Sequence, residues 1–294
     1  MRQKKLKNQQ SGPAGNDENK AKNYKKSKFS KGSHSPKTRI QTRTIKAAQG
    51  CYLMWGFHAV SAALANPTRL VRRIYASPHS KDAVTELIQN AACKTHTDMS
   101  ELIILAPDEF DTPPVYDGKR VHQHMMIEVQ PLEALDLTDI IFGDDNLRLI
   151  ILDQITDSRN VGAIIRSAKA FGCDAIIMTK HNAPTENGSL ARAAAGALEN
   201  VPIITVTNLS RTIETLKTHN ICCIGLDAAG DNTLERFSSE PRLALIMGSE
   251  NTGMRRLTKQ ACDFIITIPM RNQTESLNVS VATAIALYAT QMSD

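Results

Sequence analysis

The chain has 294 residues, with 35 Lys and Arg against 30 Asp and Glu, for a formal net charge of +5. This length suits two domains and a tail. No apolar run approaches the roughly 18–20 residues that cross a bilayer, and no signal-peptide core follows the first residue, so we expect a soluble, cytoplasmic protein. The six cysteines form no CxxC pair, which argues against a zinc site or a disulfide framework, and we expect no metal.

The basic residues are concentrated at the N-terminus. Residues 1–49 hold 14 Lys and Arg against two acids, so the total of +5 consists of +12 here and −7 in the remainder. This segment has no apolar periodicity, and we expect a disordered basic tail. A flexible cationic arm suits nucleic acid, because each neutralised phosphate releases counterions. A solvated extension without a partner is the alternative, whereas a targeting peptide would need an apolar face.

A first folded unit is expected at residues 50–130, followed by an acidic linker at residues 131–146. Alternating helix and strand patterns predict a small α/β sandwich for this unit. Within the linker, residues 136–142 could form a short apolar element. Residues 52–66 are expected to form a strand or turn that leads into a helix. A second helix is expected at residues 81–93, and strands are expected at residues 70–77, 102–105 and 121–129.

From residue 147 to residue 294 strands and helices alternate regularly. Continuous apolar runs such as LALIM, residues 243–247, are typical of strands buried on both faces. Six such strands separated by helices predict a parallel sheet covered on both faces. The expected strands are residues 149–152, 175–178, 203–206, 221–226, 243–247 and 264–268, and the expected helices are residues 161–171, 189–197, 209–219, 254–261 and 279–292.

Three strand-to-helix segments of this region are rich in polar residues, and ligands of open α/β sheets bind at such turns. In the first, LDQITDSRNVGAIIRSAKAFG (152–172), we expect Asn160 to precede a helix and Arg166 to lie off its apolar stripe. Without further information, Asn160 would be a helix N-cap and Arg166 a solvated residue. Gly172 is a candidate C-terminal cap of that helix.

The second segment, LALIMGSENTGM (243–254), places a glycine-rich turn after a buried strand. Glycines allow positive φ and the close approach of a ligand. The turn lacks G-x-G-x-x-G and a following Lys, which disfavours a dinucleotide or P-loop site. A purely structural turn would explain the glycines equally well. It explains Glu250 less well, because a carboxylate beside buried strand ends needs a partner.

The third segment, IPMRNQTESLNVSVATAIALY (268–288), has Pro269 at the end of a strand and Ser276, Leu277 and Asn278 at the start of a helix. Ser276 or Asn278 could simply cap that helix. The small and β-branched residues that follow could simply pack against the sheet.

Together these segments resemble the SpoU/TrmH family of the SPOUT superfamily, knotted RNA ribose 2′-O-methyltransferases that use S-adenosylmethionine, and most of all its 23S rRNA guanosine branch. The resemblance rests on NxGAxxR at residues 160–166, MGxExxG at 247–253 and SLNVSVA at 276–282. Weaker matches are GFHAV at 56–60 and VHQ at 121–123. His124 stands where relatives usually carry Gly, and the loop at 272–275 departs from the family's smaller, Gly-containing loop.

The resemblance implies a knotted parallel-sheet methyltransferase domain at residues 147–294, preceded by a small α/β RNA-binding domain at 50–130. It also implies a homodimer in which the partner completes the site. The implied catalytic residues are Arg166, Asn160, Glu250, Asn278 and Ser276. The implied S-adenosyl-L-methionine site is a bend formed by Met247, Gly248, Ile268, Pro269, Met270 and Leu277, largely through backbone groups.

In this family the arginine is often assigned as the base, but a guanidinium has a pKa above ~12 and retains its proton. We therefore expect Arg166 to bind the ribose hydroxyl and adjacent phosphate and to stabilise the alkoxide. Glu250 would orient Arg166 or Asn160, while Ser276 and Asn278 would position the ribose or the cofactor.

The implied reaction is methyl transfer from S-adenosylmethionine to a ribose 2′-hydroxyl in RNA, with a guanosine of 23S rRNA as the first candidate and transfer RNA as the second. A non-catalytic RNA-binding ribosome assembly factor is the alternative from another class, and the intact Arg166, Glu250 and Asn278 count against it. A generic nucleotide-binding enzyme is disfavoured by the missing phosphate loop.

Overall fold

The computed structural model describes residues 45–95, 102–111, 122–142, 145–230, 234–237, 240–270 and 276–290. Almost all of the predicted basic tail, Val121 of the VHQ motif and the loop at 272–275 lie outside the described residues. Within these ranges no helix combines the length and the apolar character that crossing a bilayer requires.

A five-stranded sheet is formed by the first part of the chain. Strand β5 lies between β1 and β2 and is antiparallel to both, while β3 and β4 pair with β2 in parallel. Apolar residues of α1 and α2 share a core with one face of this sheet, and Phe110 of η1 packs on the other. The elements are β1 (Tyr52–Trp55), α1 (Phe57–Ala65), β2 (Leu70–Ala76), α2 (Lys81–Gln89), β3 (Lys94–Thr95), β4 (Leu102–Ile104), η1 (Pro107–Asp111) and β5 (Met125–Val129).

The strand predicted at residues 121–129 begins only at Met125. Gln123 and His124, just before it, have φ angles of 51° and 54°. These left-handed conformations interrupt an extended strand and are the ones that glycine adopts most easily. His124 therefore takes a glycine-type backbone at the position where the resemblance expects glycine.

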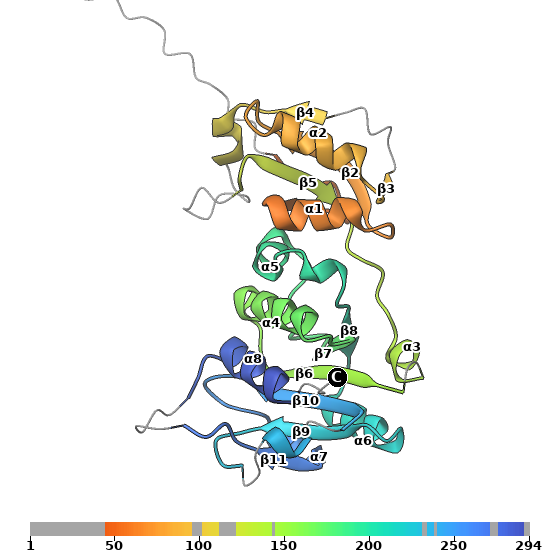
Figure 1. The fold of residues 1–294 in the computed structure, drawn as a ribbon, viewed down its shortest axis with the longest axis vertical. Helices are drawn as coiled ribbons and strands as arrows, with labels where there is room; N and C mark the ends of the chain where they lie inside the picture. Colours follow the sequence, from red (N-terminus) through yellow and green to blue (C-terminus); the bar gives the residue numbers. More distant parts are fainter. Residues whose placement is uncertain are drawn as a thin grey trace, which may run out of the picture. The chain divides into compact units, whose positions relative to one another are not determined.

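The second sheet has six strands in the order β11-β9-β10-β6-β7-β8, and all neighbouring strands are parallel. Helices α4 and α8 cover one face, α6 and α7 cover the other, and α5 packs on the outer side of α4 (Figure 1). The predicted α/β class with a parallel sheet is confirmed, whereas the knot stays a prediction. The elements are β6 (Leu147–Asp153), α4 (Ser158–Ala170), β7 (Ala175–Thr179), α5 (Gly188–Ala194), η2 (Ala197–Glu199), β8 (Ile203–Val206), α6 (Leu209–Thr218), β9 (Cys222–Leu226), η3 (Leu234–Phe237), β10 (Arg242–Gly248), α7 (Arg256–Ala261), β11 (Phe264–Ile266) and α8 (Val279–Ala289).

Two local expectations need correction. Asn160 does not cap α4: it lies in the first turn, and the N-cap is Asp157, whose carboxylate accepts the Arg159 N–H at 2.8 Å. Pro269 does not end a strand, because β11 stops at Ile266. By contrast, Gly172 follows α4 with φ 67°, as expected of a C-terminal glycine. The predicted linker contains a short helix, α3 (Leu137–Ile141).

All six cysteines are free thiols. In the part of the chain that the structure describes, no group of three or more His, Cys, Asp or Glu side chains is placed to hold a metal ion. Burial raises the pKa of Cys173 and Cys262 to about 12 and that of Cys222 to about 11. These thiols are therefore protonated at neutral pH and poor nucleophiles.

We expect iodoacetamide at pH 8 to alkylate Cys173 at least ~10-fold more slowly in the folded protein than in urea, because its sulfur is buried and little thiolate forms. A time course read by peptide mass spectrometry measures both rates. Equal rates in the two states would contradict the buried position of this thiol.

Candidate cofactor and catalytic site

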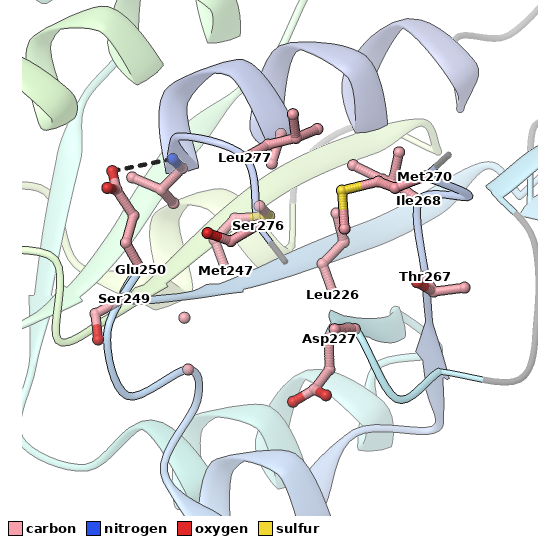
Figure 2. A pocket seen from close by; sticks show the side chains of 15 residues that line it. Leu226, Asp227, Met247, Ser249, Glu250, Thr267, Ile268, Met270, Ser276 and Leu277 are labelled. Carbon is pink, nitrogen blue, oxygen red and sulfur yellow. Dashed lines mark hydrogen bonds between the residues drawn. The ribbon is translucent and has the colours of Figure 1, made fainter. Parts of the chain in front are cut away.

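A pocket of about 250 Å³ lies at the carboxyl ends of β9 and β10, beside the segment that follows β11. Because the strands are parallel, their carboxyl ends meet at one edge of the sheet, where ligands of such folds bind. Figure 2 shows Ser249 and Glu250 on one side of the pocket and Ile268 and Met270 on the other.

Most of the predicted cofactor residues line this pocket, and Pro269 is the exception. Of the predicted catalytic residues, Glu250 and Ser276 also line it, whereas Asn160, Asn278 and Arg166 do not. The predicted cofactor residues that line the pocket are Met247, Gly248, Ile268, Met270 and Leu277.

The turn after β10 is a closed loop that brings its ends together. Ser249 and Gly253 exchange two backbone hydrogen bonds, of 3.2 and 2.8 Å. A Cβ atom on Gly248 would lie 2.3 Å from the carbonyl carbon of Gly253 and from the backbone nitrogen of Met254. Glycine is therefore required at position 248 for this closure, since no side chain fits there.

Asp153 fixes the far end of the same loop. Its side chain is fully buried at the end of β6 and accepts the Arg255 backbone N–H at 2.9 Å and the Arg255 Nε–H at 2.7 Å. Sequence reasoning did not single out this pair. The available signal was an aspartate at the end of an apolar strand, because a buried carboxylate needs a partner.

Glu250 joins the three predicted segments. Its Oε1 atom accepts hydrogen bonds from Asn160 Nδ2 at 3.2 Å, Asn278 Nδ2 at 2.8 Å and the Val279 backbone N–H at 3.2 Å. Asn278 Nδ2 is also 3.2 Å from Asn160 Oδ1, to which it donates. These are the partners that the sequence argument demanded for this carboxylate.

Asn278 also caps α8. Its Oδ1 atom accepts the Ser280 backbone N–H at 3.0 Å, while its Nδ2 group faces Glu250 and Asn160. The simple capping interpretation is therefore correct, and it is compatible with membership of the polar cluster. Ser276 is exposed at the pocket and caps no helix.

Arg166 is exposed on α4, and within the described ranges it makes no hydrogen bond or ion pair with Glu250. The hydrogen bond from Asn160 to Glu250 matches the expectation that Glu250 orients Asn160. The position of Arg166 does not match the alternative expectation that Glu250 orients Arg166. The reason is the geometry of the helix. Each residue advances ~100° around the helix axis, so Arg166, six residues after Asn160, points about 120° away from it. Arg166 is therefore available to a molecule that approaches α4 from outside.

Asp227 is a pocket residue that sequence reasoning missed. Burial raises its pKa, but hydrogen bonds from the Ala229 backbone N–H and from Lys259 outweigh burial and hold the pKa below its usual value. Lys259 Nζ lies 2.9 Å from Asp227 Oδ2. The pocket thus has an ionised carboxylate at its edge, and the signal for it was an aspartate directly after a buried strand.

Known proteins are similar to this chain in both sequence and fold. The model of the SpoU rRNA methylase family matches residues 148–288. A protein of Pasteurella multocida named 23S rRNA (guanosine-2′-O-)-methyltransferase RlmB is 39% identical over 243 residues, which cover 80% of this chain and 95% of that one. The chain belongs to the SpoU rRNA methylase family.

Further matches agree with this membership. The protein of the same name from Escherichia coli K12 is 45% identical over 171 residues, covering 57% of this chain and 70% of that one. The solved SpoU methyltransferase AviRb from Streptomyces viridochromogenes is 26% identical, with a TM-score of 0.67, covering 82% of this chain and 88% of AviRb. The family match covers the sheet that carries the pocket. It also includes Glu250 and its partners Asn160, Asn278 and Val279, which we call the Glu250 cluster.

Proposed function

We propose that this protein transfers a methyl group from S-adenosylmethionine to the ribose 2′-hydroxyl of a guanosine in 23S rRNA. The observation that carries the proposal is the Glu250 cluster, which links NxGAxxR, MGxExxG and SLNVSVA beside one pocket. The names of the relatives in E. coli and P. multocida support the choice of guanosine and of large-subunit RNA. A cytoplasmic location follows from that substrate.

The pocket suits S-adenosylmethionine. Leu226, Ile268 and Leu277 supply apolar walls for an adenine ring, and the carboxylates of Asp227 and Glu250 complement a cation. The molecule has no phosphates, and the loop at Gly248 has no phosphate-binding lysine after it. When bound, S-adenosylmethionine supplies a methyl group that its sulfonium already activates.

The protein's own residues would then act by placement and charge. We infer that Arg166 donates hydrogen bonds to the ribose hydroxyl and the adjacent phosphate and stabilises the alkoxide as the proton leaves for water or phosphate. A guanidinium holds its proton strongly and is therefore a poor base. Placement of two reactants can supply about 7–11 kcal/mol in favourable cases. Asn160, Asn278 and Ser276 would position the ribose or the methionine portion.

We also propose that the protein is a homodimer that pairs through α4 and α8. Val281, Ile285 and Tyr288 on α8 are exposed although they are apolar, and with Ala163 and Ser167 of α4 they line a shallow depression. Exposed apolar patches of this kind mark protein interfaces. Arg166 lies on the same helix, so a partner there would bring further groups to it.

Tritiated S-adenosylmethionine and total RNA from cells that lack the gene test the reaction class and the RNA class together. Label in 23S rRNA alone is expected. Label in transfer RNA alone would contradict the proposed substrate. Cofactor binding without label in any RNA would favour the assembly-factor alternative.

Gly248→Ala is expected to weaken binding of S-adenosylmethionine at least ~10-fold, because the added Cβ forces the closed loop apart. Calorimetric titration measures the affinity. Gly172→Ala is the control: a Cβ at Gly172 meets nothing within 4 Å, and Gly172 does not line the pocket. Unchanged affinity in Gly248→Ala would contradict the assignment of this loop to the cofactor.

A further inference from the structure

A cluster of buried charged residues lies at the contact between two units. The first unit carries the five-stranded sheet, and the second unit carries the six-stranded parallel sheet. At the centre of the cluster is Arg69, which is 0% exposed. Its Nε and Nη2 atoms donate to the two carboxylate oxygens of Glu199 at 3.0 and 2.7 Å, and Nη1 donates to Glu186 at 3.1 Å and to the Gln130 carbonyl at 2.8 Å. We call Arg69, Glu186, Glu199, Tyr52 and Asn66 the Arg69 cluster.

The remaining members complete the hydrogen bonding of both carboxylates. Tyr52 donates its hydroxyl to Glu186 Oε2 at 3.0 Å, and Asn66 Nδ2 donates to Glu199 Oε2 at 2.8 Å. Burial alone would lower the pKa of Arg69, but its hydrogen bonds and the neighbouring negative charges outweigh burial and raise it. Burial and Glu186 raise the pKa of Tyr52. The cluster therefore holds one arginine cation, two carboxylate acceptors and a neutral phenol.

The cluster joins segments that are distant in the sequence. Tyr52, Asn66 and Arg69 belong to the first unit. Glu186 precedes α5 and Glu199 ends η2 in the second unit, 117 to 134 residues away along the chain. A bidentate arginine–carboxylate pair fixes both the distance and the relative orientation of the two side chains.

The backbone is packed closely around the cluster. A Cβ atom on Gly188 would lie 1.8 Å from the Trp55 ring, and one on Gly196 would lie 2.8 Å from Ala62 Cβ. On the other side of α5, a Cβ atom on Gly162 of α4 would lie 2.4 Å from Ala193 Cβ. The first unit is thus in direct contact with α5, and α5 with the helix that carries Asn160 and Arg166.

Stability alone is a weak reason for such a cluster. Desolvation offsets much of the attraction within a buried ion pair, and apolar side chains of similar volume often stabilise a fold as well. What charged, bidentate contacts add is a defined geometry. The Arg69 cluster lies between the two units. The geometry that it defines is therefore the placement of one unit relative to the other.

We propose that Arg69 is a positioning residue: the Arg69 cluster locks the first unit onto α5 and thereby sets its placement relative to α4. This inference rests on the proposed function, with Arg166 of α4 at the target ribose, and on the RNA-binding role that the family resemblance implies for the first unit. RNA held by the first unit then presents its target ribose at a constant position. An RNA too short to reach the first unit does not depend on the lock.

The test compares Arg69→Met, Arg69→Lys and the wild type, with Arg211→Met on α6 as a control at an exposed arginine. For a long 23S rRNA fragment, Arg69→Met is expected to raise KM for RNA 10-fold or more and Arg69→Lys to a smaller extent. For a short hairpin containing the target nucleotide, kcat/KM should change less than twofold, as should the Kd for S-adenosylmethionine. Equal losses on both RNAs would indicate general damage and overturn the proposal.

Amide hydrogen exchange supplies a readout that needs no turnover. Arg69→Met should accelerate exchange in residues 52–55 and 186–201, on the two sides of the contact, and leave residues 243–254 at the pocket unchanged. Glu199→Gln keeps an acceptor oxygen and removes one charge, so it should show the same pattern more weakly. This variant serves as the test if Arg69→Met folds poorly. Unchanged exchange in both variants overturns the lock, whereas absence of methyl transfer by the wild type contradicts only the proposed function.

Discussion

Replacing Arg166 by alanine is expected to lower kcat for methyl transfer by about 100-fold or more while changing the Kd for S-adenosylmethionine less than twofold. Arg166 is exposed on α4 and does not line the pocket, so its removal leaves the cofactor's surroundings intact. Removing one group that stabilises developing negative charge typically costs ~10²–10³ in kcat. Steady-state kinetics and calorimetric titration separate the two effects.

Two further variants sharpen this prediction. Arg166→Lys keeps the positive charge but loses the planar fork, so it should retain only part of the activity. Lys169→Ala removes another exposed cation one turn further along α4 and should leave kcat within about twofold. An Arg166→Ala enzyme as active as the wild type would eliminate Arg166 from the chemistry.

Glu250→Ala is expected to impair both catalysis and cofactor binding. One oxygen of this carboxylate accepts three hydrogen bonds from Asn160, Asn278 and the Val279 backbone, so all three donors lose this acceptor together, and Asn278 keeps only its bond to Asn160. Leaving donors unpaired costs ~1–3 kcal/mol where they are buried, and less here because the cluster is partly exposed. We expect kcat to fall about 100-fold and the affinity for S-adenosylmethionine several-fold, since Glu250 also lines the pocket.

Glu250→Gln distinguishes charge from geometry, because the amide keeps one acceptor oxygen and loses the negative charge. Recovery of activity in Glu250→Gln would mean that the hydrogen bonds, and not the charge, are what the site requires. Glu214→Ala on α6 removes an exposed carboxylate elsewhere and should change neither parameter. Normal kinetics and normal affinity in Glu250→Ala would refute the role assigned to the cluster.

The strands of the parallel sheet could be predicted because each is a short apolar run between polar turns. β8 (Ile203–Val206) occupies the predicted range, and β10 extends the predicted one by a residue at each end. The order of the strands could not be predicted in this way, because it depends on where each helix returns the chain. The late start of β5 was missed because the left-handed backbone at His124 is unusual for a residue other than glycine.

Contacts in the site could be predicted where a polar group next to buried strand ends required a hydrogen-bond partner. Glu250 demanded donors, and the structure supplies Asn160 and Asn278. Asp153 escaped notice because its partner Arg255 lies 102 residues away. The Arg69 cluster escaped for the same reason: Arg69 and Glu199 are 130 residues apart, and in a sequence each resembles an ordinary surface charge.

Mapping ribose methylation along 23S rRNA from cells tests directly whether this protein methylates a guanosine of that RNA. RNA is compared from the parent strain, from a deletion of this gene, and from deletions that carry either the wild-type gene or Arg166→Ala. We expect one guanosine to lose its 2′-O-methyl group in the deletion, to regain it with the wild-type gene and to remain unmethylated with Arg166→Ala. An unchanged methylation map of 23S rRNA in the deletion strain would contradict the proposed function.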